Sequence, residues 1–278
     1  MRQGLGQTPH PVPSVFNAAR ELELDGRERF EAEVVARARI ENVSQERLIR
    51  LRAGEIIAVP GDGDGILDVP GGLLHHWRGA AFIPDVTLDE VVATAQDYSS
   101  YADNYEWIVG GEVLNHERDE EQARDLFEIS LRIERSASVV KGILDLWTVI
   151  DYQRQSTGFA SAVSTTDCIR QIENAGRPNE RRLPVSTGRG YLWRAITLST
   201  YIQDEGSVIV EFETIGLSRR FPRMLGWLIE PIARRLGRSS AADSLRKLRR
   251  AVTGDLQESA RGRVDLVLVP LPSFWCSQ

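Results

Sequence analysis

The chain has 278 residues, of which 42% are hydrophobic, and a formal net charge of -6; these values are typical of a globular protein with a sizeable core. The acidic balance argues against a nucleic-acid binder. The sequence contains no run of about 18 apolar residues, so it predicts no membrane-spanning helix. The start of the sequence carries no legible secretory signal, and two distant cysteines, Cys168 and Cys276, suit a reducing compartment. These features favour a cytoplasmic protein.

Residues 1–60 are predicted to form an N-terminal extension, mostly helical, on a main domain. Residues 1–13 carry three prolines, which is typical of a loose arm. Ser44 precedes a predicted short helix that Gly54 ends, and residues 55–59 read as a strand. The PGDGDG stretch that follows is a turn by composition, which we interpret as a hairpin turn, because its residues fail the spacing of a calcium loop.

A predicted strand then leads into a predicted helix. Residues 71–84 read GGLLHHWRGAAFIP. Thr87 followed by Glu90 is a capping-box pattern, and the apolar residues after it keep the spacing of one helix face, so a helix should begin near residue 88. An aromatic-rich turn follows, up to Trp107.

From Trp107 to about residue 217 the pattern is mainly that of strands. Residues 127–134 alternate apolar and polar side chains, as in a strand with one wet face. Residues 143–152 and 191–202 are apolar or amphipathic on both sides. Residues 177–189 carry two prolines and four arginines, which predicts a loop or flap between strands.

Two helical pieces are predicted near the end of the sequence. Each has an apolar stripe, with Ser240 as the N-cap of the second piece and Pro231 as a kink or restart in the first. Residues 219–250 hold ten Lys or Arg residues against two acidic ones. This basic end is a candidate for transient contact with an anionic membrane surface; the alternative is a solvated helix face neutralised by acidic loops.

This order of elements resembles the START/Bet v 1-like superfamily, also called SRPBCC, and more narrowly a bacterial branch of it. The segments that carry the resemblance are HHWRGAAFIP, GYLWR at residues 190–194 and GWLIEPIARRL at residues 226–236. The resemblance implies an α+β helix-grip fold, in which a curved antiparallel sheet wraps around a long C-terminal helix with a cavity between them. We accordingly expect the helix-grip domain at residues 61–256 and a C-terminal tail at residues 257–278.

The resemblance also implies a function, the binding or transport of a lipid or other hydrophobic small molecule. Aromatic side chains suit an apolar wall, and their hydroxyl and indole groups can orient a polar end of the ligand. The candidate positions in the cavity or at its mouth are His75, Trp77, Trp107, Trp147, Tyr152, Trp193 and Arg194. Arg194 would counter an acidic head group, but it lies opposite Trp193 in a strand, so both cannot line one wall.

Two other functions stay open. Familiar hydrolase, nucleotide-binding and zinc motifs are missing, so we expect no metal, no cofactor and no nucleophile at Cys168. His75 and His76 must point to opposite faces of a strand, and one of them with a cavity tyrosine would suit a polyketide cyclase/dehydrase-like enzyme. A scaffold with a cavity filled by side chains is the third function. No nucleic-acid partner is expected.

Overall fold

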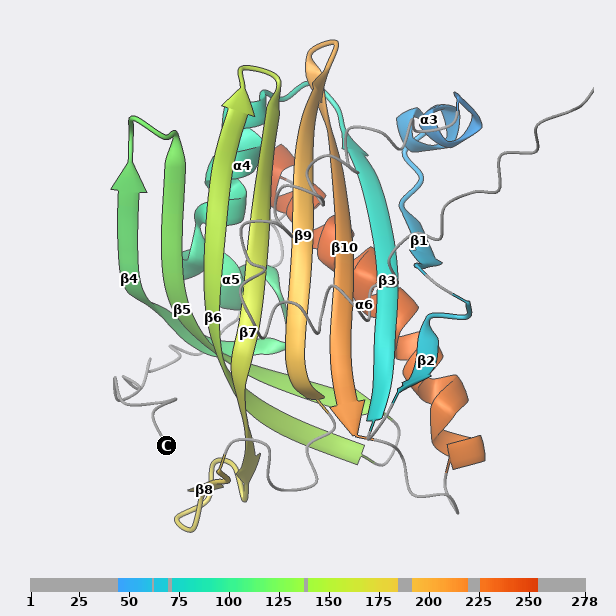
Figure 1. Ribbon diagram of the computed structural model, residues 1–278, viewed down its shortest axis with the longest axis vertical. Helices are drawn as coiled ribbons and strands as arrows, with labels where there is room; N and C mark the ends of the chain where they lie inside the picture. The colour runs from blue at the N-terminus through green and yellow to red at the C-terminus, as the bar shows by residue number, and fades with distance from the viewer. Residues whose placement is uncertain are drawn as a thin grey trace, which may run out of the picture. The chain divides into compact units, whose positions relative to one another are not determined.

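The computed structural model describes residues 45–61, 63–69, 72–137, 140–184, 192–219 and 226–254. Ten strands in these ranges form one antiparallel sheet, and α4, α5 and α6 lie behind it in Figure 1. The strands are β1 (Ile57–Pro60), β2 (Ile66–Val69), β3 (Gly72–Ile83), β4 (Ile108–Asp119), β5 (Arg124–Ala137), β6 (Val140–Ser156), β7 (Phe159–Glu173), β8 (Arg181–Arg182), β9 (Leu192–Asp204) and β10 (Ser207–Arg219). The helices are α3 (Gln45–Arg52), α4 (Leu88–Gln96), the 3-10 helix η1 (Tyr98–Ser100), α5 (Tyr101–Asn104) and α6 (Gly226–Thr253).

The strand order of the sheet is β1-β3-β10-β9-β7-β6-β5-β4, with β2 also paired to β3 and β8 to β7. Neighbours from β4 to β7 follow one another along the chain, whereas β3 pairs over its full length with β10. The short helices connect β3 to β4, and α6 follows β10. A curved antiparallel sheet with a long helix after its last strand confirms the predicted α+β helix-grip fold (Figure 1).

Side chains alternate along each strand, so the sheet has two faces. We call the face towards α4, α5 and α6 the concave face and the opposite one the convex face. The concave face carries the main core, which lies between the strands and these helices. Its buried members are Ala81, Ile83, Leu88, Val91, Ala95, Tyr98, Phe127, Ile129, Ile150, Tyr152, Ala160, Ala162, Tyr201, Val208, Val210 and Leu245.

Two glycines allow close packing around Trp77 on β3. A Cβ atom at Gly237 of α6 would lie 2.3 Å from Trp77 Nε1, and one at Gly65 would lie 2.6 Å from Trp77 Cζ2. Further along β3, a Cβ atom at Gly79 would lie 2.9 Å from Leu245. The absence of side chains at these positions lets the helix and the preceding loop pack directly on the strand.

The segment between β1 and β2 is not the hairpin turn that its composition predicted. β1 pairs with residues 77–80 of β3 and β2 with residues 72–75, so both run in the same direction along one edge. Gly61 N donates to His76 O and His76 N donates to Gly65 O, both at 2.9 Å. Composition indicated a bend, but the direction of the chain after the bend depends on pairing with β3.

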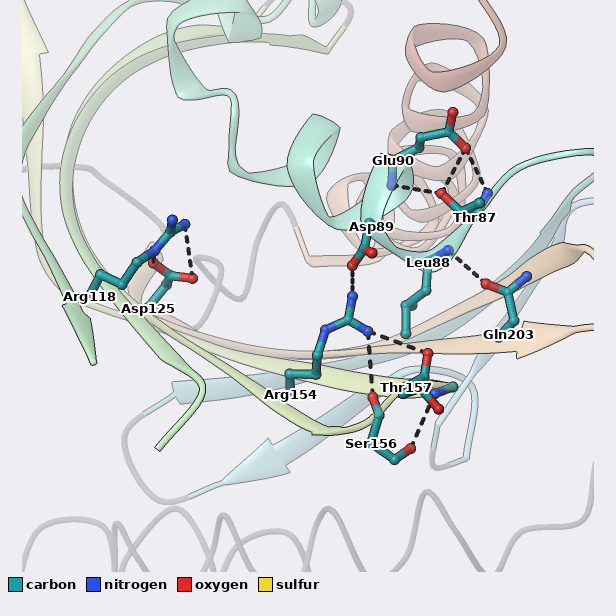
Figure 2. Close-up of polar contacts among 11 residues, drawn as sticks. Thr87, Leu88, Asp89, Glu90, Arg118, Asp125, Arg154, Ser156, Thr157 and Gln203 are labelled. Atoms are coloured by element: carbon teal, nitrogen blue, oxygen red, sulfur yellow. Dashed lines mark hydrogen bonds and ion pairs between the residues drawn. The ribbon is translucent and has the colours of Figure 1, made fainter. Parts of the chain in front are cut away.

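α4 begins where the capping box predicted. The Thr87 hydroxyl accepts from Glu90 N at 3.3 Å, and the Glu90 carboxylate accepts from Thr87 N at 2.8 Å. Leu88 N donates to the side-chain oxygen of Gln203 at 2.7 Å, which ties the start of the helix to the end of β9 (Figure 2). These bonds fix the height of α4 above the sheet.

α6 is one continuous helix where the sequence predicted two pieces. Ser240 lies inside it rather than at an N-cap, and Pro231 lies in its second turn. Ala241 and Leu245, which are 6% and 2% exposed, pack towards the sheet, and such tertiary contacts outweigh a local capping preference. No helix in the described ranges has both the length and the apolar character needed to cross a membrane.

Part of the N-terminal extension is described. α3 forms as predicted, with Gly54 at φ +87° after it, and the next strand begins at Ile57. Arg52 of α3 pairs with Asp204 at the end of β9, with 2.8 Å between nitrogen and oxygen. The arm at residues 1–13, the tail at residues 257–278 and the second half of the flap at residues 177–189 lie outside the described residues, and the domain boundaries stay predictions.

Candidate functional site

Hydroxyl groups gather inside the concave core where β6 and β9 face η1 and α5. The tyrosine cluster consists of Tyr98, Tyr101, Tyr105, Tyr152 and Tyr201. The hydroxyls of Tyr98 and Tyr152 lie 2.9 Å apart. Ala95 O, at the end of α4, accepts from the hydroxyls of Tyr101 at 2.7 Å and Tyr152 at 3.1 Å. The result is a chain of polar groups within an apolar enclosure.

Burial raises the pKa of every tyrosine in the cluster. The pKa values of Tyr98, Tyr101 and Tyr152 lie well above their ordinary value, and the proximity of other tyrosines adds to the effect of burial. Burial raises the pKa of Tyr201 to about 12. The phenols are therefore protonated at neutral pH, so they can donate and accept hydrogen bonds but cannot act as bases.

A pocket of about 280 Å³ lies beside the cluster, between α4 and the adjoining ends of β4 to β7. Tyr152 belongs to both the pocket and the cluster and so connects them. The apolar lining consists of Val92, Ala93, Ala123 and Ala160, and the polar lining consists of Asp89, Gln96, Arg118, Asp125, Gln153 and Arg154. This combination suits a ligand with an apolar body and a polar end.

Two ion pairs stand at this pocket (Figure 2). Arg154 of β6 pairs with Asp89 in the first turn of α4 and also donates to two backbone oxygens of the β6–β7 turn. Arg118 Nε lies 2.7 Å from Asp125 Oδ1. Burial alone would raise the pKa of Asp125, but hydrogen bonds from Arg118 and His116 lower it overall. The pocket therefore carries both positively and negatively charged side chains near neutral pH.

β3 places His75 and His76 on opposite faces, as predicted. His75 lies on the concave face with Trp77; its Nε2 is 2.7 Å from Ser218 Oγ, and burial lowers the pKa of its ring. The Trp77 indole is packed between Gly65 and Gly237. In the described part of the chain, His75 therefore contributes a hydrogen bond near α6, while Trp77 contributes packing and its indole nitrogen has no hydrogen-bond partner.

His76 is enclosed on the convex face. It is 0% exposed, its Nε2 lies 2.5 Å from Glu213 Oε1, and a Cβ atom at Gly61 would lie 2.2 Å from its ring. Burial alone would raise the pKa of Glu213, but the hydrogen bond from His76 and the charge of Arg78 lower it. This arrangement is a structural ion cluster. Among the described residues no group of three or more metal-binding side chains is found.

Trp107 and Tyr152 are the predicted site residues that the structure brings together. Trp107 precedes β4, and its ring centroid lies 5.3 Å from that of Tyr105. The ring of Tyr105 lies 5.0 Å from that of Tyr101. Trp107 therefore extends the aromatic contacts of the tyrosine cluster, to which Tyr152 belongs.

Trp147 and Arg194 lie on the convex face. Trp147 is paired with Ser130 and Cys168, and Arg194 with Leu217. Trp147 does not share a wall with Tyr152, because the two positions differ by an odd number along one strand. The side chain of Trp193 is outside the described part of the chain. Ligand binding by any of these residues stays a prediction.

The basic residues of α6 divide into paired and exposed groups. Arg234 pairs with Asp64 at 2.9 Å, and Lys247 pairs with Glu106 at 2.7 Å. These contacts join α6 to the β1–β2 segment and to the turn after α5. The exposed members are Arg235, Arg238 and Arg250.

Sequence reasoning missed most of the cluster and the ion pairs of the pocket. A signal for the tyrosines was present, since residues 98, 101 and 105 are spaced as one side of a helical turn. The ion pairs carry no such signal, because charged residues near turns usually read as solvated surface. Their partners also come from distant strands, so that only the register of the sheet brings them together.

The sheet, the gripped helix and the enclosed tyrosines define a helix-grip protein with a ligand-sized pocket on its concave side. Several solved structures are similar to this chain in fold. A STAR-related lipid transfer protein from Xanthomonas axonopodis is 18% identical, with 69% of this chain and 98% of that chain covered and a TM-score of 0.41. A Streptomyces aromatase/cyclase is 13% identical, with 69% and 99% covered and a TM-score of 0.36. A START superfamily protein from Mycobacterium smegmatis is 11% identical, with 66% and 98% covered and a TM-score of 0.39.

The fold assignment rests on this chain's own strand order and on the long helix that follows its last strand. No protein-family model and no curated protein matches the sequence.

Proposed function

We propose that this protein binds a small hydrophobic molecule with a polar end in the pocket under α4, beside the tyrosine cluster. The observation that carries the proposal is the position of Tyr152. Its side chain lines the pocket, while its hydroxyl is held by Tyr98 and by Ala95 O inside the core. A hydroxyl network next to an apolar wall is what orients an amphipathic ligand.

The dimensions of the pocket narrow the class of ligand. Its volume of about 280 Å³ lies near the lower end of the range for small-molecule sites, roughly 300–1,000 Å³. Such a volume suits a single acyl chain or a small ring compound and is too small for a two-chain lipid. Gln96 and Gln153 add neutral donors and acceptors beside the ion pairs.

The test compares Ala93→Trp with Ala53→Trp. Ala93 is exposed on α4 and lines the pocket, so an indole there would occupy it, whereas Ala53 is an exposed alanine after α3. The probes are anilinonaphthalene sulfonate and a chain-length series of single fatty acids, followed by fluorescence and native mass spectrometry. We expect Ala93→Trp to weaken binding at least tenfold, about 1.4 kcal/mol, and Ala53→Trp to leave it unchanged. Equal binding by both variants, or no binding by the parent protein, contradicts the proposal.

Catalysis by His75 or His76 with Tyr201 is not supported. His75 is paired with Gly216 of β10, and Tyr201 with Val210 of the same strand. At about 3.3 Å per residue these positions lie roughly 20 Å apart, too far to act on one atom. His76 is on the other face of the sheet.

A scaffold is the second candidate function. The observation that favours it is the density of buried side chains between the strands and α6, where Leu245, Val210 and Ala81 occupy the centre of the concave face. In a scaffold the small pocket would hold only water, and the probe series would not bind to the parent protein.

We further propose that α6 contacts an anionic membrane surface during loading of the ligand. Arg235 and Arg238 are exposed and three positions apart, so they lie on neighbouring parts of the helix surface. Sedimentation with vesicles that contain phosphatidylserine tests this. The double change Arg235→Glu with Arg238→Glu should abolish binding at low salt, and Arg250→Glu at the other end of α6 is the control. Equal sedimentation of the two variants contradicts the proposal.

A further inference from the structure

The two arginines at the pocket differ in how firmly their carboxylate partners are held. Asp125, the partner of Arg118, has a side chain that is 19% exposed, and its Oδ1 also lies 2.9 Å from His116 Nε2. Asp89, the partner of Arg154, has a side chain that is 84% exposed. An exposed ion pair is weak in water, so Asp89 can leave its arginine at little cost, whereas Asp125 cannot.

Asp89 does not depend on Arg154 for its charge. It lies in the first turn of α4, where the positive end of the helix dipole stabilises a carboxylate with or without a basic neighbour. The side chain is also open to water over most of its surface. Asp89 therefore stays ionised when the pair separates.

Arg154 is held at the pocket by bonds that do not involve Asp89. Its Nη1 donates to Ser156 O at 3.4 Å and to Thr157 O at 3.5 Å, and its backbone N donates to Ala123 O at 3.0 Å. Figure 2 shows the guanidinium between Asp89 and the β6–β7 turn. Without Asp89, the guanidinium would remain in place with donors available to an incoming group.

We propose that the polar end of the ligand is a single carboxylate, which replaces Asp89 on Arg154. This inference rests on the function proposed above and names the class of ligand, a monocarboxylic acid with one apolar chain. The planar guanidinium can donate two parallel N–H bonds to such a group. The apolar chain would lie against Val92, Ala93 and Ala160 of the pocket lining.

The charges of the pocket favour one negative charge on the ligand. Arg118 and Arg154 in the lining are balanced by Asp89 and Asp125. When Asp89 turns to solvent, the remaining three groups leave one positive charge, which a monoanion neutralises. A doubly charged phosphate ester would instead leave a negative excess beside Asp125.

The test compares octanoate with octan-1-ol, which have the same apolar chain and differ in the charged end. Titration calorimetry at neutral pH measures both affinities. The parent protein should bind octanoate roughly tenfold more tightly, and Arg154→Gln should remove this preference by weakening octanoate binding alone.

Asp89→Asn should have the opposite effect. The neutral amide competes less well for Arg154, so octanoate binding should strengthen about two- to fivefold while octan-1-ol binding stays the same. Glu46→Gln is the matched control, because it makes the same charge change in the first turn of another helix, α3. Since Asp89 is exposed, this variant tests the proposal even where Arg154→Gln does not fold.

The outcomes separate this inference from the proposed function. Equal affinity of the parent protein for the two probes overturns the carboxylate assignment and leaves the proposed function in place. The same holds if Asp89→Asn binds octanoate no more tightly than Glu46→Gln does. Binding of neither probe by the parent protein contradicts the proposed function and this inference with it.

Discussion

The two faces of the sheet satisfy their buried polar groups in different ways. On the concave face the hydroxyls of Tyr98 and Tyr152 bond to each other and to the backbone of α4. On the convex face, charged residues form ion-pair clusters around Asp145. Buried polar atoms without a hydrogen-bond partner in the described ranges occur on both faces, at Trp77 on the concave face and at Ser130 and Trp147 on the convex face. The strand β6 contributes side chains to both faces. The difference teaches that neighbouring residues of one strand, because their side chains alternate between the two faces, meet different polar surroundings.

The largest effect is expected at Asp145 on the convex face. Its side chain is 0% exposed and accepts from Arg132 at 2.6 and 2.9 Å and from Arg182 at 3.0 Å. Asp145→Ala leaves two guanidinium groups without this carboxylate and should lower the free energy of unfolding by about 3–5 kcal/mol. Denaturant unfolding measures the change. Glu180→Ala removes an exposed partner of Arg132 and should cost at most about 1 kcal/mol; equal losses would mean that Asp145 is not the centre of the cluster.

Alkaline pH should break the concave face first. Because the folded pKa of Tyr201 is about 12 and an unfolded tyrosine titrates near pH 10, roughly, the folded state holds its proton over that interval. Stability is therefore full below about pH 10 and falls by roughly 2–3 kcal/mol as pH rises to about 12. Tyr201→Phe should flatten this part of the curve in urea titrations at several pH values. An unchanged slope would contradict the burial of this phenol.

The close approach of α6 to β3 can be tested at Gly237. A Cβ atom there would meet the Trp77 indole at 2.3 Å, so Gly237→Val should overpack the contact and cost about 1–3 kcal/mol. Gly142→Val is the control, because a Cβ atom at Gly142 meets nothing within 4 Å. Thermal unfolding followed by tryptophan fluorescence measures both. If the control loses more stability than Gly237→Val, α6 is not seated on Trp77.

Removal of a single hydroxyl is the smallest change. Tyr152→Phe deletes the group that bonds to Tyr98 and to Ala95 O and should cost about 1–2 kcal/mol. Ala95 O keeps the bond from Tyr101, which limits the loss. Tyr105→Phe serves as the matched control in chemical unfolding. A larger loss in the control would move the polar centre of the cluster away from Tyr152.

The sequence predicted those features that depend on near neighbours. The Thr87 capping box placed the start of α4, and alternation placed His75 and His76 on opposite faces. The prediction from sequence failed where pairing between residues far apart in the chain determines the structure. The composition of residues 60–65 could not show whether the chain reverses direction or continues along β3 after a break in the pairing. The N-cap expected at Ser240 did not form, because the packing of Leu245 favours one continuous helix.

The candidate site was predicted only in part for the same reason. Trp107 and Tyr152 were selected from their residue types, but the link between Tyr152 and Tyr98 depends on how β6 lies under η1. Trp147 was assigned by type alone, although its odd spacing from Tyr152 already separated the two. Register, which no local pattern encodes, turns a set of aromatic residues into a site.

The pairing of β3 with β10 has a consequence for biogenesis. Ile83 finds its partner Val208 only after β4 to β9 have been synthesised, so β3 leaves the ribosome long before its neighbour on that side exists. Such non-local closure slows folding and leaves an apolar edge exposed in the nascent chain. β1 and β2 are synthesised just before β3 and pair with its other edge. They can therefore cover one edge of β3 before β10 has been synthesised.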